Sequence, residues 1–563
     1  MSLLFIFLSF PLICNGYDII SITGNLSSSS SSSFIPNAFS TITVWDPQSL
    51  TSTPPLTLSV SYPYLTHVEL FTATGGCYEG YSGCTTTRDL FNDPSIGMAS
   101  GVNASRLFLP LSNILKAGLI PHIITGNVPI ILSGDNVFIG AFGFNSAPPT
   151  NFSEYSLYLE KVTSQLVDEF SLDIVKRWRW GVYTEFNNQD WLKGTSKTFE
   201  DLFDYSVCGI ERGLGGPANV NVGVHACQQC GGSLDWNPIS FLTHAANGIS
   251  ACTGGPVHLN WTGNSFYEHS PGDPGDLSWF ASQGLIILEE ARSLGLPTKR
   301  FGIDEGRLLW GPEGPQFALT TRAIGDSYQA SWDALLFKLL TQTGVSESYY
   351  SRWGVNSGDG LFSQGNGVID NAASNLAQLA FKMNGTLFVP TINTTQTTLG
   401  LSFVDAVVGA SKEDHILRIL VFHHYPLLNI SETVTPLTAF ISICGISTSV
   451  PSGPVDAATV TRIDDTNANF WPTWRRDSFA ANISRANGDY NSGWSEFSDN
   501  IPLASTRAIN LLAENTLRYK SLALLVEEKF TGVSISSNSH CLSFEIDMVP
   551  HSVALVEVND VVY

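Results

Sequence analysis

A glutamate follows a strand-like run in the stretch RWRWGVYTEFNNQDW, residues 177–191. Aromatic residues alternate with other types around Trp178 and Trp180, which is the spacing of a β-strand. Glu185 comes where this strand should end, and the polar residues 187–190 follow it. A carboxylate at the end of a buried strand costs free energy unless it is paired or opens into a cleft. Glu185 is therefore either a solvated strand end or a group placed to do chemistry.

A second glutamate has a similar position in FGIDEGRLLWG, residues 301–311. Glu305 follows a strand-like run, and Asp304 beside it is a competing carboxylate. Because adjacent residues of a strand point to opposite sides, only one of the two is expected to face a site. Two carboxylates suit glycoside hydrolysis, since one protonates the leaving oxygen while the other attacks the sugar or activates water. A solvated strand end is the alternative for Glu305 as well.

The elements that would position these glutamates alternate between strand and helix. Strand-like runs and amphipathic segments succeed one another from residue 56 to 385, for example a short helix followed by the strand 120–124. This alternation predicts an α/β fold, a (β/α)8 or TIM barrel, rather than a doubly wound sheet. In such barrels catalysis takes place at the C-terminal ends of the strands. Glu185 would end strand four and Glu305 strand seven.

The two ends of the chain have a different character. Residues 1–16 are apolar and end in small residues, which is typical of a signal peptide. Residues 17–55 are expected to form an N-terminal segment that packs on a β domain. Residues 386–563 are dominated by strand-like segments with turn residues between them, which predicts a C-terminal all-β sandwich domain. A helix-like segment at 510–528 interrupts these strands.

The order of several segments resembles glycoside hydrolase family 39, the family of β-xylosidases and α-L-iduronidase. The acid/base segment of that family reads like W-x-F-E-x-W-N-E-P, and residues 178–186 are similar to it in layout. NILKAGLIPHI resembles a helix and strand three ahead of that segment, and LGGPAN resembles a Gly-Gly-Pro segment after the next helix. GIDEG resembles the iduronidase-type nucleophile segment. The resemblance covers about residues 60–385, and the β-rich remainder also suits the family.

The resemblance implies roles for individual residues. Glu185 would be the general acid/base and Glu305 the nucleophile of a retaining enzyme. Substrate contacts would come from four residues near strand ends: Thr184, Asn187, Tyr267 and Trp353. An ordinary loop aromatic is the alternative interpretation for Tyr267, and core packing is the alternative for Trp353. Neither a cofactor nor a metal is implied, and no metal-ligand spacing is evident in the sequence.

Departures from the family pattern bear on the substrate. Thr184 stands where the family has the Asn that hydrogen-bonds the 2-hydroxyl of the sugar, and Phe186 stands where it has Pro. The Lys that would hold a uronate carboxylate in an iduronidase is missing. The sequence therefore favours a xylosidase-like enzyme that acts on neutral terminal sugars. The alternatives are an iduronidase-like uronic-acid glycosidase and a catalytically silent carbohydrate-binding glycoprotein.

Charge and composition indicate a secreted glycoprotein. Lys plus Arg number 28 against 50 Asp plus Glu, and the net charge of -22 disfavours nucleic acid as a partner. The expected partner is a carbohydrate substrate; the sequence does not indicate an oligomeric state. No later apolar run reaches the length of a membrane span, so the expected location is outside the cell, or in a lysosome or vacuole. The Asn-x-Ser/Thr sequons agree with this route: Asn25, Asn103, Asn151, Asn260, Asn384, Asn393, Asn429 and Asn482.

The cysteines suggest disulfides. The sequence has 9, of which Cys14 lies in the predicted signal peptide. Cys77 and Cys84 are close enough in sequence to close a short loop, and Cys444 with Cys541 would tie the C-terminal region together.

Four further cysteines cluster in sequence: Cys208, Cys227, Cys230 and Cys252. Cys227-x-x-Cys230 alone would suit a metal or redox site. A set of structural disulfides is the favoured interpretation, because no second CxxC or HxxxH accompanies it. Three scattered histidines are interpreted as structural rather than catalytic: His225, His244 and His258.

Overall fold

The computed structural model describes residues 19–26, 33–44, 47, 62–79, 86–140, 143–227, 238–268, 285–308, 326–352, 362–363, 367–383, 387–389, 393–395, 403–411, 413–424, 436–447, 449–484, 487–489 and 505–562. The predicted signal peptide and the sequon residues Asn384 and Asn429 lie outside these ranges. Within them, no helix is long and apolar enough to cross a membrane.

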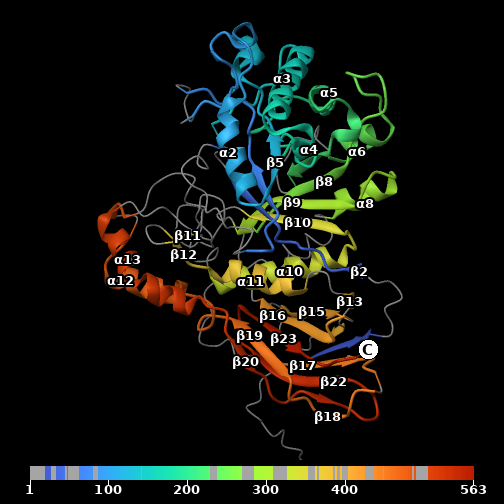
Figure 1. The fold of residues 1–563 in the computed structure, drawn as a ribbon, viewed down its shortest axis with the longest axis vertical. Coiled ribbons are helices and arrows are strands. Elements are labelled where there is room, and N and C mark those ends of the chain that lie inside the picture. The colour runs from blue at the N-terminus through green and yellow to red at the C-terminus, as the bar shows by residue number, and fades with distance from the viewer. Residues whose placement is uncertain are drawn as a thin grey trace, which may run out of the picture.

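The upper part of Figure 1 is a closed barrel of parallel strands. Its strands are β3 (Thr41–Val44), β4 (His67–Leu70), β5 (Ile120–Thr125), β6 (Arg179–Val182), β7 (Val222–Cys227), β8 (Trp261–Glu268), β9 (Arg300–Leu308) and β10 (Glu347–Arg352). The last strand pairs with the first, so the sheet has no free edge. The predicted barrel is confirmed. Glu185 follows the fourth strand and Glu305 lies in the seventh, as the sequence indicates.

Helices alternate with the barrel strands along the chain. They are α2 (Ser105–Lys116), α3 (Phe152–Phe170), α4 (Leu172–Val175), α5 (Ser196–Gly213), α6 (Pro238–Asn247), α8 (Ile286–Ser293), α10 (Ser327–Gln342) and α11 (Ala372–Met383), with 3-10 turns η3 (Gly97–Ser100), η4 (Ile130–Asn136) and η5 (Pro217–Asn219). Local sequence sets where helix α3 begins, because the Asn151 side chain accepts hydrogen bonds from the backbone of Ser153 and Glu154. Large aromatic side chains then fill the barrel core, among them the fully buried Trp180 and Trp261.

Two antiparallel-rich sheets form the lower part of Figure 1. One contains β14 (Asn393–Thr395), β1 (Ile19–Asn25), β17 (Leu437–Cys444), β22 (Leu542–Met548), β21 (Ser534–Ile535) and β18 (Gly453–Pro454). The other contains β2 (Ser33–Phe34), β13 (Leu387–Val389), β15 (Phe403–Ser411), β16 (Ile416–His424), β23 (Ser552–Val558), β19 (Ala458–Ile463) and β20 (Glu527–Lys529). Buried and half-buried residues alternate along β17, which is the pattern of a strand with one face in a core. The predicted β-sandwich is confirmed.

The N-terminal segment does not belong to one domain. Its strands β1 and β2 join the two sandwich sheets, whereas β3 is the first strand of the barrel. The barrel therefore begins with β3 at Thr41, ahead of the predicted start at residue 56. The apolar run that forms β3 is only four residues long, so its sequence alone did not separate it from the sandwich strands.

A small ribbon and two further helices lie beside the two domains. The pair β11 (Phe362–Ser363) and β12 (Gly367–Val368) forms a small antiparallel ribbon. Helices α12 (Trp471–Ala480) and α13 (Thr506–Leu522) pack on each other and extend to one side of the molecule (Figure 1). Helix α13 confirms a helix in the segment predicted at 510–528, but the helix ends at Leu522 and the end of the predicted segment belongs to β20.

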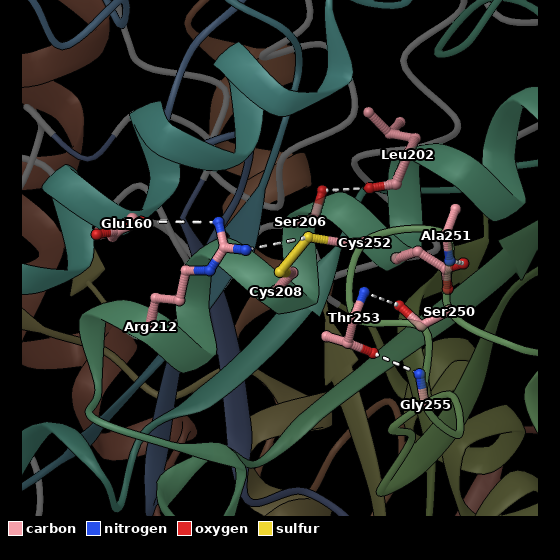
Figure 2. The surroundings of a disulfide bond; sticks show 11 residues. Glu160, Leu202, Ser206, Cys208, Arg212, Ser250, Ala251, Cys252, Thr253 and Gly255 are labelled. Carbon is pink, nitrogen blue, oxygen red and sulfur yellow. Dashed lines mark hydrogen bonds and ion pairs between the residues drawn. A yellow bond between two sulfur atoms is a disulfide. The ribbon is translucent and has the colours of Figure 1, made fainter.

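The barrel and the sandwich each contain a disulfide bond. Cys444 bonds Cys541, as predicted, and Cys208 on α5 bonds Cys252 in the loop after α6. Figure 2 shows that the Arg212 guanidinium lies beside the second bond, 3.7 Å from the Cys252 sulfur. Cys77 and Cys227 are disulfide-bonded as well, which favours the structural interpretation of the cysteine cluster. Cys84 and Cys230 lie outside the described residues.

Candidate active site

A sharp turn after β6 presents Glu185 to the barrel interior. Tyr183 and Glu185 both have positive φ angles, 64° and 41°, which non-glycine residues rarely adopt. The buried ring of Tyr183 holds this turn, because its hydroxyl accepts a hydrogen bond from the Val128 amide at 3.2 Å. Such strain is tolerated where surrounding packing determines it, and it is common at functional sites. The Glu185 side chain is 5% exposed, so it is not a solvated strand end.

A β-bulge in β9 turns two adjacent carboxylates toward the same side. Ile303 pairs with Asn264 on β8, but the next pairing joins Glu305 to Ser265, so Asp304 is the extra residue. The bulge cancels the alternation of side chains at this point, so Asp304 and Glu305 both reach the barrel interior. Which of the two serves the site stays a prediction, and the sequence selects Glu305.

Both carboxylates reach one imidazole ring. Glu305 Oε1 lies 3.2 Å from His225 Nε2, and Asp304 Oδ2 lies 3.8 Å from His225 Nδ1. His225 comes from β7 and is fully buried. The sequence favours a structural over a catalytic role for His225, and the structure adds that its ring contacts the predicted nucleophile. The signal that could have identified it is its place on barrel strand five, two residues before the strand ends.

Thr184 completes the contacts of Glu305. Its hydroxyl donates to Glu305 Oε1 at 2.5 Å and lies 2.8 Å from His225 Nε2. The backbone nitrogen of Glu185 lies 3.2 Å from the same ring nitrogen. The ends of strands four, five and seven thus meet at one imidazole. The predicted acid/base and the predicted nucleophile are brought into one site.

The electrostatics of the site separate the two glutamates. Burial and the negative charge of Glu305 raise the pKa of Glu185 to about 7, although the Asn188 amide acts against this rise. That amide donates to Glu185 Oε2 at 2.9 Å. Burial by itself lowers the pKa of His225, but the carboxylates of Asp304 and Glu305 outweigh it, so the pKa is raised. The site therefore combines a carboxyl group of raised pKa with a second carboxyl group that lies beside an imidazole of raised pKa.

Asn187 holds the site together instead of facing a ligand. Its amide nitrogen donates to the Cys227 carbonyl at 2.8 Å, and its amide oxygen accepts from the Cys227 amide at 2.7 Å. These bonds join the segment after β6 to the end of β7. These bonds indicate a positioning role for Asn187, and its predicted contact with the substrate stays a prediction.

The remaining predicted residues have different outcomes. Phe186 stacks on Phe199 of α5 with ring centroids 4.1 Å apart, so it packs in the core beside the site. Tyr267 lies in β8, at the position paired with Arg307. Its side chain is outside the described part of the structure, as is Trp353 entirely.

A second layer of polar residues lies deeper in the barrel. The Tyr349 hydroxyl donates to Asp304 Oδ1 at 2.5 Å, and the Arg179 guanidinium lies 4.7 Å from the centre of the Tyr349 ring. Glu69 and His122 belong to the same layer and are fully buried. The donor atoms of Glu69, His122 and Asp304 lie within 4.8 Å of one another, so these three residues are the ones placed to hold a metal ion.

Comparisons with known proteins agree on the fold. No family model and no curated protein matches the chain. Solved structures do: the GH39 enzyme from Xanthomonas axonopodis pv. citri has a TM-score of 0.62 at 10% identity, covering 98% of this chain and 99% of that one. A monomeric β-xylosidase from Caulobacter crescentus CB15 has a TM-score of 0.58 at 11% identity, covering 96% and 99%.

A third similar structure is described as the bacterial orthologue of human α-L-iduronidase. Its TM-score is 0.60 at 13% identity, and the match covers 96% of this chain and 84% of that one. At such low identities the shared property is the fold, which includes both the barrel and the sandwich. The fold implied by the resemblance to family 39 is thus confirmed.

Proposed function

We propose that this protein is a retaining glycoside hydrolase in which Glu185 is the general acid/base and Glu305 is the nucleophile. The observation that carries the proposal is that two glutamates from barrel strands lie in one buried site with different surroundings. Glu185 has a pKa of about 7, so it is protonated below neutral pH, whereas Glu305 accepts a hydrogen bond from Thr184 and faces His225. Glycoside hydrolysis by retention requires such a pair, with the two carboxyl groups roughly 5–5.5 Å apart.

In the first step the glycosidic bond breaks. Glu185 gives its proton to the glycosidic oxygen, and a Glu305 oxygen attacks the anomeric carbon. The bond between that carbon and the leaving oxygen breaks, the leaving group departs as an alcohol, and a glycosyl ester forms on Glu305. Because the Glu185 proton is now gone, the ionised group is ready to act as a base.

In the second step water releases the sugar. Glu185 removes a proton from a water molecule, whose oxygen attacks the anomeric carbon from the face that the leaving group vacated. The ester bond breaks and Glu305 is restored as a carboxylate. Two inversions give a product with retained configuration, and Glu185 has regained its proton.

Thr184 and His225 act on the nucleophile in this scheme. The Thr184 hydroxyl donates its hydrogen bond to Glu305 and so orients the attacking oxygen. His225 Nε2 lies 3.2 Å from Glu305 Oε1, so the imidazole helps to hold the nucleophile in place before attack and after its release in the second step. Both are positioning residues, because they reach the sugar through Glu305.

A neutral terminal sugar is the proposed substrate, with xylosides as the first choice. The missing uronate-binding Lys supports this preference, and the similar structures include proteins described as β-xylosidases. Secretion is also part of the proposal, supported by the disulfides Cys208–Cys252 and Cys444–Cys541. An iduronidase-like specificity has support from the similarity to the iduronidase orthologue.

A screen of aryl glycosides against the secreted protein tests the proposal. We expect turnover of a neutral glycoside, and loss of turnover in Glu305→Gln. Glu200→Gln, on the outer helix α5, is a matched control that should retain activity. Turnover of an aryl iduronide alone would move the assignment to the uronic-acid class. Binding of sugars without turnover of any glycoside would show a carbohydrate-binding protein and overturn the enzyme assignment.

A further inference from the structure

Three side chains converge inside the barrel beneath the proposed catalytic pair. Glu69 comes from β4, His122 from β5, and Asp304 from the bulge in β9. All three are 0% exposed, and one donor atom from each lies within 4.8 Å of the other two. Strands β4 and β9 are not neighbours in the barrel, so the side chains meet across its interior.

Several polar atoms of this cluster make no hydrogen bond. Across the described residues, no hydrogen bond is found for either Glu69 carboxylate oxygen, for either His122 ring nitrogen, or for Asp304 Oδ2, whose contact with His225 Nδ1 is a longer ion pair of 3.8 Å. A buried polar atom without a partner destabilises the folded state. Five such atoms in one place would be expensive for a folded protein, so a ligand that satisfies several of them together is expected.

The spacing of the atoms indicates what kind of ligand fits. His122 Nδ1 and Glu69 Oε2 are 3.5 Å apart, which exceeds the usual hydrogen-bond range of about 2.7–3.2 Å. Metal–ligand bonds of about 2.0–2.2 Å in a tetrahedral zinc site put neighbouring donors about 3.3–3.6 Å apart. The observed separation therefore suits two ligands of one metal ion better than it suits a direct hydrogen bond.

We propose that Glu69, His122 and Asp304 bind one divalent cation of the Zn²⁺ type. One imidazole nitrogen and two carboxylate oxygens are ligands that Zn²⁺ and Mn²⁺ accept. The surrounding residues support the ligands: the Tyr349 hydroxyl holds the other oxygen of Asp304, and the Trp261 ring packs edge-to-face against His122. No step of the proposed hydrolysis passes through the ion.

Two acidic side chains of the cluster lie together in the barrel interior. The donor atoms of Glu69 and Asp304 lie within 4.8 Å of each other, and both residues are fully buried. Arg179 is the buried cation of this layer, but its guanidinium lies over the Tyr349 ring. In the described part of the chain it makes no hydrogen bond to Glu69 or Asp304. A divalent ion would offset the repulsion between these carboxylates directly.

The ion would fix the bulge that presents Glu305. Asp304 is the bulged residue, and tying it to β4 and β5 would anchor the seventh strand to the second and third. The sequence gives no sign of the site, because its ligands are separated by 53 residues (from 69 to 122) and by 182 residues (from 122 to 304). Such spacings match no short metal motif.

Metal content and thermal unfolding of the secreted full chain test this proposal without using activity. We expect about one equivalent of zinc or manganese by mass spectrometry of the digested protein. Dialysis against dipicolinate should remove the ion and lower the Tm, and one equivalent of Zn²⁺ or Mn²⁺ should restore it. A chain that contains no metal, and whose Tm is unchanged by either ion, would overturn the proposal.

Two variants locate the site. Glu69→Gln and His122→Gln keep the size of the side chain but weaken or remove a ligand, so each should lose the stoichiometric ion and the Tm response to it. His244→Gln is the control, since His244 pairs with Asp204 outside the barrel and should leave metal content unchanged. If both cluster variants retain one equivalent of ion, the ion is bound elsewhere and the assignment fails. If the variants do not fold, the wild-type measurements alone decide.

Discussion

The proton on Glu185 sets the pH dependence of the proposed reaction. Its pKa of about 7 means that the group is protonated below neutral pH and ionises as the pH rises through that value. The first step needs the protonated form, so kcat/KM for a substrate with a poor leaving group should fall on the basic side near pH 7. The measurement is a pH–rate profile between about pH 4 and pH 9.

The control for this prediction is Glu185→Ala with an activated aryl glycoside. A good leaving group departs without protonation, so the basic limb near pH 7 should disappear in this variant and added azide should restore turnover with retained configuration. A basic limb that persists unchanged in Glu185→Ala would assign the titration to another group.

Thr184 gives a second prediction at the scale of single residues. Thr184→Val keeps the shape of the side chain but removes the hydroxyl that donates to Glu305. We expect kcat to fall about 10- to 100-fold with little change in KM, because the lost bond orients the nucleophile and does not bind the sugar. Thr184→Ser should retain most of the activity. A rise in KM without a fall in kcat would instead identify Thr184 as a substrate contact.

At the scale of elements, the sequence predicted the strands better than their irregularities. The alternation around Trp178 and the apolar run before Asp304 were sufficient to place both glutamates on barrel strands. The bulge in β9 was not predictable, because it depends on pairing with β8 and not on the local pattern. The role of His225 was missed for a related reason, since its partners are 41 and 80 residues away along the chain.

The Cys208–Cys252 bond gives a prediction at this scale. It ties helix α5 to the loop after α6, and its cysteines are 44 residues apart. Chain-entropy arguments give a loop of this size about 4 kcal/mol of stabilisation. The double variant Cys208→Ala/Cys252→Ala should therefore unfold at a clearly lower Tm, while its kcat at low temperature should stay close to that of the parent. An unchanged Tm would show that the bond does not constrain the unfolded chain.

At the scale of the whole molecule, the barrel core extends onto one face of a sandwich sheet, while the sandwich also has an inner core of its own. Leu420 and Phe422 of β16, and Leu555 of β23, pack in the same buried cluster as the barrel residues. Helices α10 and α11 lie between the barrel and the sandwich sheets in Figure 1. The N-terminal chain adds a second link, since it supplies β1 to the sandwich before it supplies β3 to the barrel. The two domains are therefore expected to depend on each other for stability.

Calorimetry of the full chain tests this dependence. We expect a single cooperative unfolding transition, and we expect Phe422→Ala to lower its temperature by removing about 3–5 kcal/mol of stability. Val421→Ala is a useful comparison, because the neighbouring Val421 faces the inner core of the sandwich instead. Two separate transitions, of which Phe422→Ala shifts only one, would contradict the shared core.

The molecular architecture was predictable from the sequence because it depends on long, repeated patterns. The alternation of strand-like and helix-like segments predicted the barrel, and the strand-like segments separated by turns predicted the sandwich. The domain boundary was not predictable, because the short strand β3 is identified only by its pairing with β4 and β10. The buried polar layer was also missed, since residues such as Glu69 and His122 become neighbours only when the barrel closes.

The most direct test of the proposed mechanism is to trap the sugar on its nucleophile. The secreted protein would be treated with 2-fluoro-substituted glycosides that carry good leaving groups, beginning with the xyloside, because such sugars form the glycosyl ester but release it slowly. Mass spectrometry of the digested protein should then find one sugar on the peptide that contains Glu305, attached at Glu305. Attachment at Asp304, or no attachment under conditions in which the unsubstituted glycoside is hydrolysed, would contradict the assignment of Glu305 as nucleophile.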